Sequence, residues 1–256
     1  MTEIHSAISD WLDKIENEEN IKILLAVESG SRAWGFASPD SDFDVRFIYV
    51  RTQGDYLKLE KTRDVLECIL NAELDITGWD IKKALQLAHA SNPTLYEWLN
   101  SPIVYREHPF AEKMRKVVKT YFSSRAGLHH YLNMVEGNYR EYLKGDAVKL
   151  KKYFYVLRPI LACRWILANK TPPPMAFQPL MESQMEAPLI PVIEDLLQKK
   201  QSSPEMGEGP RIDALNKYIE ESFIMLEDAV KKDVPDGERN WDDLNGLFRE
   251  ALGLHS

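Results

Sequence analysis

Cysteine is scarce in this chain: its 256 residues contain two, Cys68 and Cys163, and each lies in an apolar stretch. This scarcity excludes a disulfide-rich scaffold, and we expect two buried, reduced thiols. No spacing of cysteine and histidine resembles a zinc site. A chain of this length can bury a sizeable core without such crosslinks.

Long apolar runs are also missing. The longest, residues 160–168, contains Arg164 and is too short to span a bilayer. The N-terminal segment MTEIHSAISDWLDKIENEEN is acidic and has no apolar centre, which is not typical of a signal peptide. We therefore expect a soluble, cytoplasmic protein.

Positive charge is in deficit. Lysine and arginine total 32 against 40 aspartates and glutamates, which gives a formal net charge of −8. The surface as a whole then repels polyanions. A nucleotide or an RNA would have to bind through a local positive patch or through metal ions.

Apolar periodicity predicts an α+β arrangement in the first part of the chain. Residues 3–19 and 79–89 have the pattern of amphipathic helices. Short apolar or alternating runs predict four strands. These strands cover residues 21–27, 42–50, 62–69 and 73–77.

The remainder is predicted to be helical, with a proline-rich connection over residues 171–179. The expected helices cover residues 93–100, 110–121, 124–143, 147–168, 187–201, 212–232 and 241–252. This change of pattern predicts a catalytic α+β domain over residues 1–105 and an all-helical domain over residues 106–256.

The segment from Ser29 to Val45 has the strongest chemical pattern. Gly30 and Ser31 follow a buried strand and open a turn whose backbone N–H groups suit an oligophosphate. Asp42 and Asp44 come about a dozen residues later, and alternate residues of a strand face the same side. Two adjacent carboxylates favour a cation between them, and carboxylate oxygens are ligands that Mg²⁺ prefers.

A third carboxylate is expected from the strand over residues 73–77. Asp75 lies between Leu74 and Ile76, which face the core, so its carboxylate faces the other side. Asp75 is therefore the candidate that completes the metal site and helps to deprotonate an attacking hydroxyl. Glu73 and Asp80 compete for this role, although an acid in the first turn of a helix, as at Asp80, is favoured by the helix dipole alone.

The order of Gly-Ser, Asp-x-Asp and a later strand aspartate resembles the polymerase-beta nucleotidyltransferase superfamily. More narrowly, four blocks are similar to the RNA-repair-pathway polymerase-beta-type nucleotidyltransferases, also called the YcgL-like family. They are SGSRAWGFASPDSDFDVRFIY, ELDITGWDIKKAL, NPTLYEWLNSPIVY and KKYFYVLRPILACRWI. The resemblance covers roughly residues 20–170.

The resemblance implies transfer of a nucleoside monophosphate from an NTP to a hydroxyl acceptor, with an RNA end favoured. It implies two Mg²⁺ ions, with Mn²⁺ as an alternative, on Asp42, Asp44 and Asp75. Gly30 and Ser31 would hold the β and γ phosphates.

Four cationic residues are candidates for phosphate contacts. Arg32 lies in the glycine turn, and Arg46 continues the alternation of the paired aspartates. Lys151, Tyr155 and Arg158 are spaced to share one helix face. Relatives in the superfamily place a triphosphate-binding lysine on a helix beyond the catalytic sheet, and Lys151 and Arg158 resemble that arrangement. For all four, an ordinary surface position is the competing interpretation.

Other interpretations stay open at this point. The sequence PDSD is also favourable for a solvated turn, which would leave Asp42 and Asp44 without a catalytic role. The acceptor could instead be a protein side chain or a small molecule, which the acidic composition favours. A non-catalytic nucleotide-binding protein on the same fold is a third interpretation. The sequence carries no signal for the oligomeric state.

Overall fold

The computed structural model describes residues 3–69, 73–202, 206–232 and 239–254. The chain forms two compact units. The first, here called the sheet unit, comprises Met1–Ala33, Asp42–Phe122 and Glu238–Ser256. The second, the helical unit, comprises Trp34–Ser41 and Ser123–Gly237.

The sheet unit contains a five-stranded sheet with the order β3-β4-β2-β1-β5. Its strands are β1 (Lys22–Glu28), β2 (Phe43–Val50), β3 (Val65–Ile69), β4 (Leu74–Asp80) and β5 (Val104–Glu107). Strands β2 and β4 are parallel, and the other neighbours are antiparallel. The four strands expected from the sequence are present, and β5 adds the fifth.

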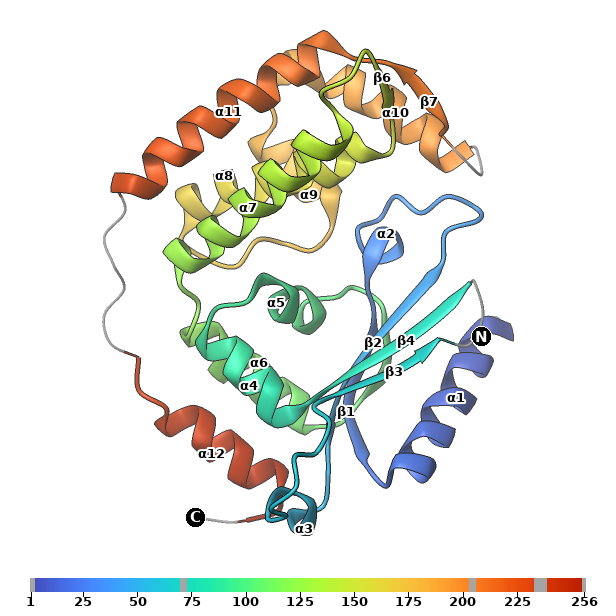
Figure 1. The fold of residues 1–256 in the computed structure, drawn as a ribbon, viewed down its shortest axis with the longest axis vertical. Coiled ribbons are helices and arrows are strands. Elements are labelled where there is room, and N and C mark those ends of the chain that lie inside the picture. The colour runs from blue at the N-terminus through green and yellow to red at the C-terminus, as the bar shows by residue number, and fades with distance from the viewer. Residues whose placement is uncertain (1–2, 70–72, 203–205, 233–238, 255–256) are drawn as a thin grey trace. The chain divides into compact units, whose positions relative to one another are not determined.

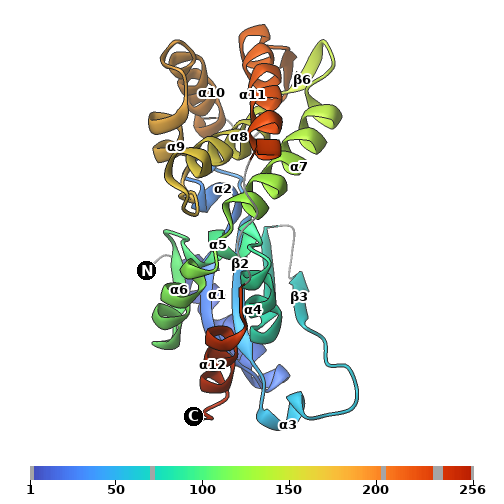
Figure 2. The same ribbon diagram turned by 90° about the vertical axis from the view of Figure 1, so that its left-hand side faces the viewer.

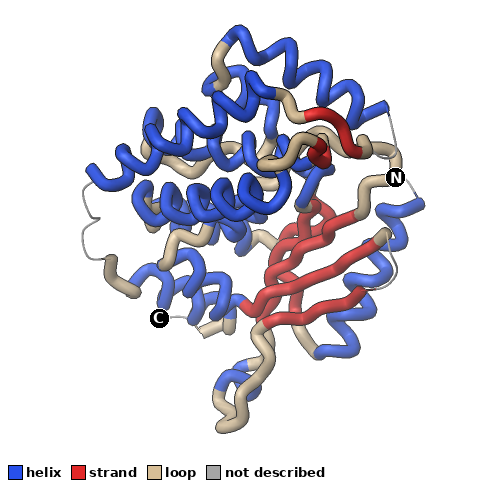
Figure 3. Tube along the Cα trace, turned by 45° about the horizontal axis from the view of Figure 1, so that its top comes forward, coloured by secondary structure: helices blue, strands red, loops and turns tan. Residues whose placement is uncertain are grey.

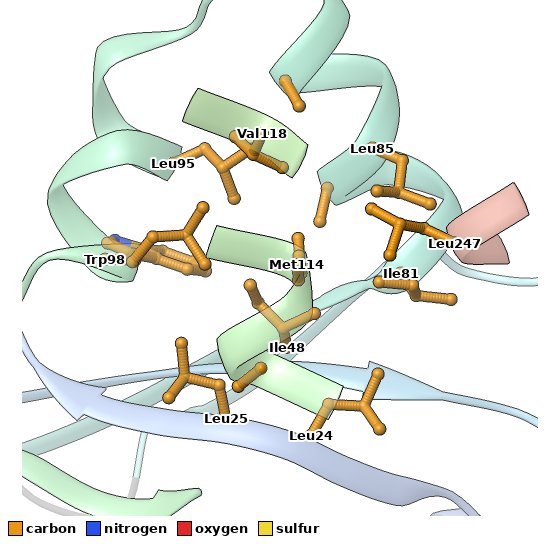
Figure 4. Close-up of a cluster of buried hydrophobic side chains, with 14 of the residues drawn as sticks. Leu24, Leu25, Ile48, Ile81, Leu85, Leu95, Trp98, Met114, Val118 and Leu247 are labelled. Atoms are coloured by element: carbon orange, nitrogen blue, oxygen red, sulfur yellow. The ribbon is translucent and has the colours of Figure 1, made fainter. Parts of the chain in front are cut away.

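Helices cover both faces of this sheet (Figure 1, Figure 2). Helix α1 (Glu3–Glu19) buries Ile8, Leu12 and Ile15 against one face. The opposite face packs against α4 (Ile81–His89), α5 (Pro93–Leu99), α6 (Phe110–Thr120) and α12 (Asp242–Ala251). Figure 4 shows side chains of this second cluster. Two single-turn helices, α2 (Gly30–Ala33) and α3 (Gln53–Tyr56), follow β1 and β2.

The helical unit consists mainly of helices (Figure 3). Its helices are α7 (Ser124–Tyr142), α8 (Lys152–Asn169), α9 (Phe177–Gln184), the 3₁₀ helix η1 (Ala187–Leu189), α10 (Ile190–Ser202) and α11 (Asp213–Lys232). Two short strands, β6 (Ala147–Lys149) and β7 (Glu208–Pro210), pair with each other. Phe36 is buried in this unit against Phe154 and Phe177.

The predicted division into residues 1–105 and 106–256 differs from these units. Met114 of α6 and Leu247 of α12 lie in the core of the sheet unit, so both helices belong there. The segment Trp34–Ser41 belongs to the helical unit, since Phe36 packs there. Contacts made across long stretches of sequence decide these assignments, and local periodicity does not report them.

Two elements of the second half also differ from the sequence prediction. The helix expected over residues 147–168 begins only at Lys152, because residues 147–149 pair with β7. The sequence predicts a proline-rich connection over residues 171–179, but residues 177–179 form the first turn of α9. Pro179 lies in the first turn of α9, where a missing N–H breaks no intrahelical bond. Within the described residues, the helices are too short or too polar to cross a membrane.

Candidate active site

The chain leaves the sheet at the end of β1 through a glycine that no other residue replaces easily. Gly30 has a φ of +58°, and an added Cβ would lie 2.1 Å from Oδ2 of Asp44. The Ser29 N–H donates to the carbonyl of Asp44 at 2.8 Å, and the Ser29 carbonyl accepts from Ala33 N at 3.4 Å. The turn therefore begins against the Asp44 carboxylate.

Asp44 and Asp75 are register partners on the parallel strands β2 and β4. Their carboxylates are joined by Arg46, whose Nη2 lies 2.8 Å from Oδ1 of Asp44 and 2.8 Å from Oδ2 of Asp75. Nη1 of Arg46 donates to the carbonyl oxygens of Val45 and Asp75. The Thr77 hydroxyl donates to Oδ1 of Asp75 at 3.1 Å. Three of the residues selected from the sequence are thus in direct contact.

Asp42 lies at the margin of this group. Strand β2 begins at Phe43, so Asp42 precedes the strand and is exposed. Its carbonyl accepts a hydrogen bond from Arg32 Nε at 3.0 Å, and the Arg32 guanidinium lies 3.6 Å from the centre of the Phe43 ring. The shared strand face predicted for Asp42 and Asp44 is therefore only approximate, because Asp42 lies in the irregular segment before the strand.

The surroundings of Asp44 disfavour its charged form. Burial raises the pKa of Asp44, Arg46 lowers it, and the charges of Asp75 and Asp42 raise it further, with a net increase. The charges of Asp42 and Asp75 thus both act on the carboxylate of Asp44. Additional positive charge near Asp44 would relieve this cost.

Asp80 is placed apart from Asp75, at the opposite end of β4. It is the N-cap of α4: Oδ1 accepts from Lys82 N at 2.8 Å, and Oδ2 accepts from the Tyr56 hydroxyl at 2.9 Å. Five residues along a strand correspond to roughly 17 Å. Asp80 therefore stabilises the start of a helix, while Asp75 lies beside Asp44. Glu73 is exposed, and its carbonyl pairs with the backbone of Phe43.

Sequence reasoning missed Glu28 and Tyr105. Glu28 ends β1 and is fully buried, and its Oε1 accepts from Asp44 N at 2.7 Å. Its Oε2 accepts a hydrogen bond from the Tyr105 hydroxyl. Burial raises the pKa of Glu28, although both hydrogen bonds lower it. A glutamate directly after the apolar run of β1 was the available signal, because a buried acid needs partners.

Two features of the donor set bear on whether it could hold a divalent cation. The carboxylates of Asp44 and Asp75 already lie around one cationic group, the guanidinium of Arg46. The missing side chain at Gly30 leaves room for Oδ2 of Asp44. In this conformation no three acidic, histidine or cysteine side chains of the described residues are grouped closely enough to hold an ion.

The cationic residues of the helical unit have unequal surroundings. Lys151 is the N-cap residue of α8 and is exposed. Arg158 is 1% exposed: it donates from Nε and Nη2 to the carbonyl of Met175, and its guanidinium lies 4.7 Å from the centre of the Trp34 ring. The shared accessible face expected for Lys151 and Arg158 is therefore not present. Arg158 has the contacts of an internal structural residue.

Lys200 is, like Arg158, a buried cation of this unit, and sequence reasoning did not select it. It is 8% exposed, and its Nζ lies 3.5 Å from the Ser38 hydroxyl. Burial lowers the pKa of Lys200, and the charge of Lys151 lowers it further. The charge of Asp40 acts on the pKa of Lys200 in the opposite direction.

The chain is similar to several known proteins. A protein of Bacillus subtilis (strain 168), the uncharacterised protein YcgL, is 45% identical over 247 residues, covering 96% of this chain and 95% of that protein. A nucleotidyltransferase-like protein from Exiguobacterium sibiricum 255-15 has 13% identity and a TM-score of 0.31, covering 86% of this chain and 73% of that one. The model of the RNA repair pathway DNA polymerase beta family matches residues 4–250, and the chain therefore belongs to that family.

Proposed function

We propose that this protein transfers a nucleoside monophosphate from an NTP to a hydroxyl group at an RNA end. The observation that carries the proposal is the pairing of Asp44 with Asp75 beside the Gly30 turn. Membership of the family supports nucleotidyl transfer as the reaction class and RNA repair as its setting. The buried network behind Asp44 supports a site built to hold a carboxylate in one position.

Each residue of the site has a defined task in this reaction. Asp44, Asp75 and Asp42 would hold Mg²⁺ or Mn²⁺, which when bound neutralises the triphosphate and lowers the pKa of the acceptor hydroxyl. The backbone N–H groups at Gly30 and Ser31 would donate to the β and γ phosphates. Arg46 keeps the Asp44 and Asp75 carboxylates oriented through its two 2.8 Å contacts.

The bond changes follow from this placement. The acceptor oxygen attacks the α-phosphorus, and the bond from that phosphorus to the bridging oxygen of the β-phosphate breaks. Pyrophosphate leaves with the electron pair of that bond. Asp75 accepts the acceptor's proton or passes it to solvent. The protein contributes position and charge, and no covalent enzyme intermediate is needed.

The net charge of −8 favours a second candidate, transfer to a protein side chain or small molecule. Both candidates are tested by incubating the protein with each α-labelled NTP, Mg²⁺ or Mn²⁺, and one acceptor at a time. The acceptors are RNA with a 3′ hydroxyl, the same RNA with a 3′ phosphate, and a cell protein extract. Label on the hydroxyl-ended RNA alone supports the RNA proposal.

Label on protein would replace the RNA proposal with the second candidate. Binding of NTP without label on any acceptor would indicate a non-catalytic nucleotide-binding protein. The Asp44→Asn variant is the matched control, because a contaminating enzyme would label the acceptor equally in both preparations.

A further inference from the structure

The buried acid Glu28 occupies the point where β1 leaves the sheet. Its side chain is 0% exposed, and it lies directly before the Ser29-Gly30-Ser31 turn. A carboxylate is seldom fully buried without a specific partner. The hydrogen-bond partners of Glu28 indicate its role.

The backbone pairing between β1 and β2 is incomplete at this point. Glu28 is the register partner of Val45, so Ser29 follows opposite Asp44. The Ser29 N–H donates to the Asp44 carbonyl. In a regular antiparallel pair, the Asp44 N–H would also donate to the Ser29 carbonyl. The Ser29 carbonyl instead accepts from the N–H of Ala33, the last residue of the single-turn helix α2.

The Glu28 side chain supplies the missing acceptor. Its Oε1 takes the Asp44 N–H at 2.7 Å. The chain can therefore turn away at Gly30 while the backbone of Asp44 stays hydrogen-bonded on that side. Without Glu28, either the Asp44 N–H would lose its partner or Ser29 would have to stay in the sheet.

Glu28 is itself held from several sides. The Tyr105 hydroxyl donates to its other carboxylate oxygen. Its backbone N–H donates to the Ile103 carbonyl at 3.0 Å, and its carbonyl accepts from the Ser101 hydroxyl at 2.6 Å. The backbone of Glu28 is thus fixed, and each of its two carboxylate oxygens accepts one hydrogen bond, which restricts rotation of the side chain.

We propose that Glu28, fixed by Tyr105, is the positioning residue that sets the backbone of Asp44 and so aims its carboxylate at the divalent cation. This inference rests on the proposed function, because it assigns Glu28 a role in the same site. Glu28 acts as a hydrogen-bond acceptor and not as a further ligand or base. Two substitutions separate these roles.

Glu28→Gln removes the charge but keeps an oxygen that accepts from Asp44 N–H, while its NH₂ group donates to the Tyr105 oxygen. Glu28→Met keeps the length and removes the acceptor. Tyr105→Phe keeps the Glu28 carboxylate but removes the hydroxyl that donates to it. This variant replaces Glu28→Met in the test if Glu28→Met fails to fold. Glu107→Met, on the exposed edge strand β5, is the matched control for a glutamate-to-methionine change in the sheet.

The full-length variants are compared by two measurements that do not need turnover. Amide hydrogen exchange, followed by NMR, reports on the Asp44 N–H, and Mn²⁺ binding is followed by electron paramagnetic resonance. We expect Glu28→Met or Tyr105→Phe to speed exchange at Asp44 at least tenfold and to weaken Mn²⁺ binding about tenfold. Glu28→Gln and Glu107→Met should stay within about threefold of the wild type.

Unchanged exchange at Asp44 in Glu28→Met and Tyr105→Phe would overturn the inference. So would a Glu28→Gln variant that loses Mn²⁺ as Glu28→Met does, because the charge of Glu28 would then act directly. Lower thermal stability with unchanged exchange at Asp44 and unchanged Mn²⁺ affinity would make Glu28 merely structural. Failure of the proposed function would give a different result. The wild type would then show no Mn²⁺ binding that is lost in Asp44→Asn. Exchange at the Asp44 N–H would still differ between the wild type and Glu28→Met.

Discussion

The carboxylates of Asp44 and Asp75 share one nitrogen of Arg46, which lies 2.8 Å from an oxygen of each. The two aspartates come from parallel strands in register, so their backbone positions are fixed by the ladder between β2 and β4. A cation between them offsets the repulsion of two like charges. Chemistry at this position therefore depends on the balance of charge as well as on geometry.

Asp44→Asn should abolish nucleotidyl transfer, by about 100-fold or more, because loss of charge stabilisation in an active site has effects of that size. The fold should persist, because asparagine keeps the volume and the Glu28 bond goes to the backbone. Asp64→Asn, which removes an exposed acid paired with Lys83, is the control. Labelled-NTP transfer and circular dichroism are measured for both. A folded, active Asp44→Asn variant would show that Asp44 is not a catalytic residue.

Asp75→Ala and Asp80→Ala should fail in different ways. Asp75→Ala should lose transfer with little change in unfolding free energy, since Asp75 lies partly exposed beside Asp44. Asp80→Ala should lose the N-cap of α4, about 1 kcal/mol, and leave the Tyr56 hydroxyl without its acceptor. Urea unfolding and transfer rates are compared for both variants and for Glu73→Ala. An inactive but stable Asp80→Ala variant would show that the third carboxylate has been misassigned.

Gly30→Ala should reduce both stability and transfer. The new Cβ would lie 2.1 Å from the Asp44 carboxylate oxygen, and the φ of +58° is unfavourable for alanine. Gly35→Ala is the comparison: its φ is also positive, but no atom lies within 4 Å of an added Cβ. We expect both variants to lose stability from backbone strain and only Gly30→Ala to lose metal-dependent transfer. Equal transfer in the two variants would contradict the close contact with Asp44.

The stability of the protein should vary with pH through Asp80. Burial raises the pKa of Asp80 above its ordinary value of 3.8. A raised folded-state pKa contributes stability below the unfolded pKa, and this contribution is lost as the pH rises through the folded pKa. The wild type should thus lose stability relative to Asp80→Asn as the pH increases from about 4 toward neutral. Urea unfolding of both proteins across this range measures the difference, and a constant difference would refute it.

Lys151→Met and Arg158→Met should also separate. Arg158→Met leaves the Met175 carbonyl without its buried donor, which costs about 1–3 kcal/mol. Lys151→Met should leave unfolding unchanged and raise the KM for NTP, if the lysine contributes charge at the phosphates as the family resemblance implies. Lys149→Met on β6 is the control. Unchanged KM in Lys151→Met would place the phosphate contacts wholly in the sheet unit.

Much of the sheet unit could be predicted from the sequence because its signals are local. The alternation of Leu74, Asp75 and Ile76 correctly indicated which residue faces away from the core. The Gly-Ser turn and the first strand were visible as an apolar run followed by small polar residues. Strand partners were not visible, since the register of Asp44 with Asp75 joins segments separated by β3.

The parts that were missed depend on tertiary contacts. Periodicity gave Lys151 and Arg158 a common face, but the packing of Trp34 and Met175 around Arg158 buries one and leaves the other exposed. Glu28 is not selected from the sequence because its partners, Tyr105 and Ser101, come more than seventy residues later. A pairing of this kind leaves no periodic trace.

The sheet unit is assembled from three separate stretches of chain, and this has a consequence for how the protein is made. Helix α12 packs on α4 and α6 but is translated only after the whole helical unit. Phe36, near the beginning, must wait for Phe154 and Phe177 before it is covered. The two units are therefore not packed in the order in which their elements are synthesised. During synthesis the apolar surface of α4 and α6 that α12 covers therefore stays exposed until α12 itself has been made.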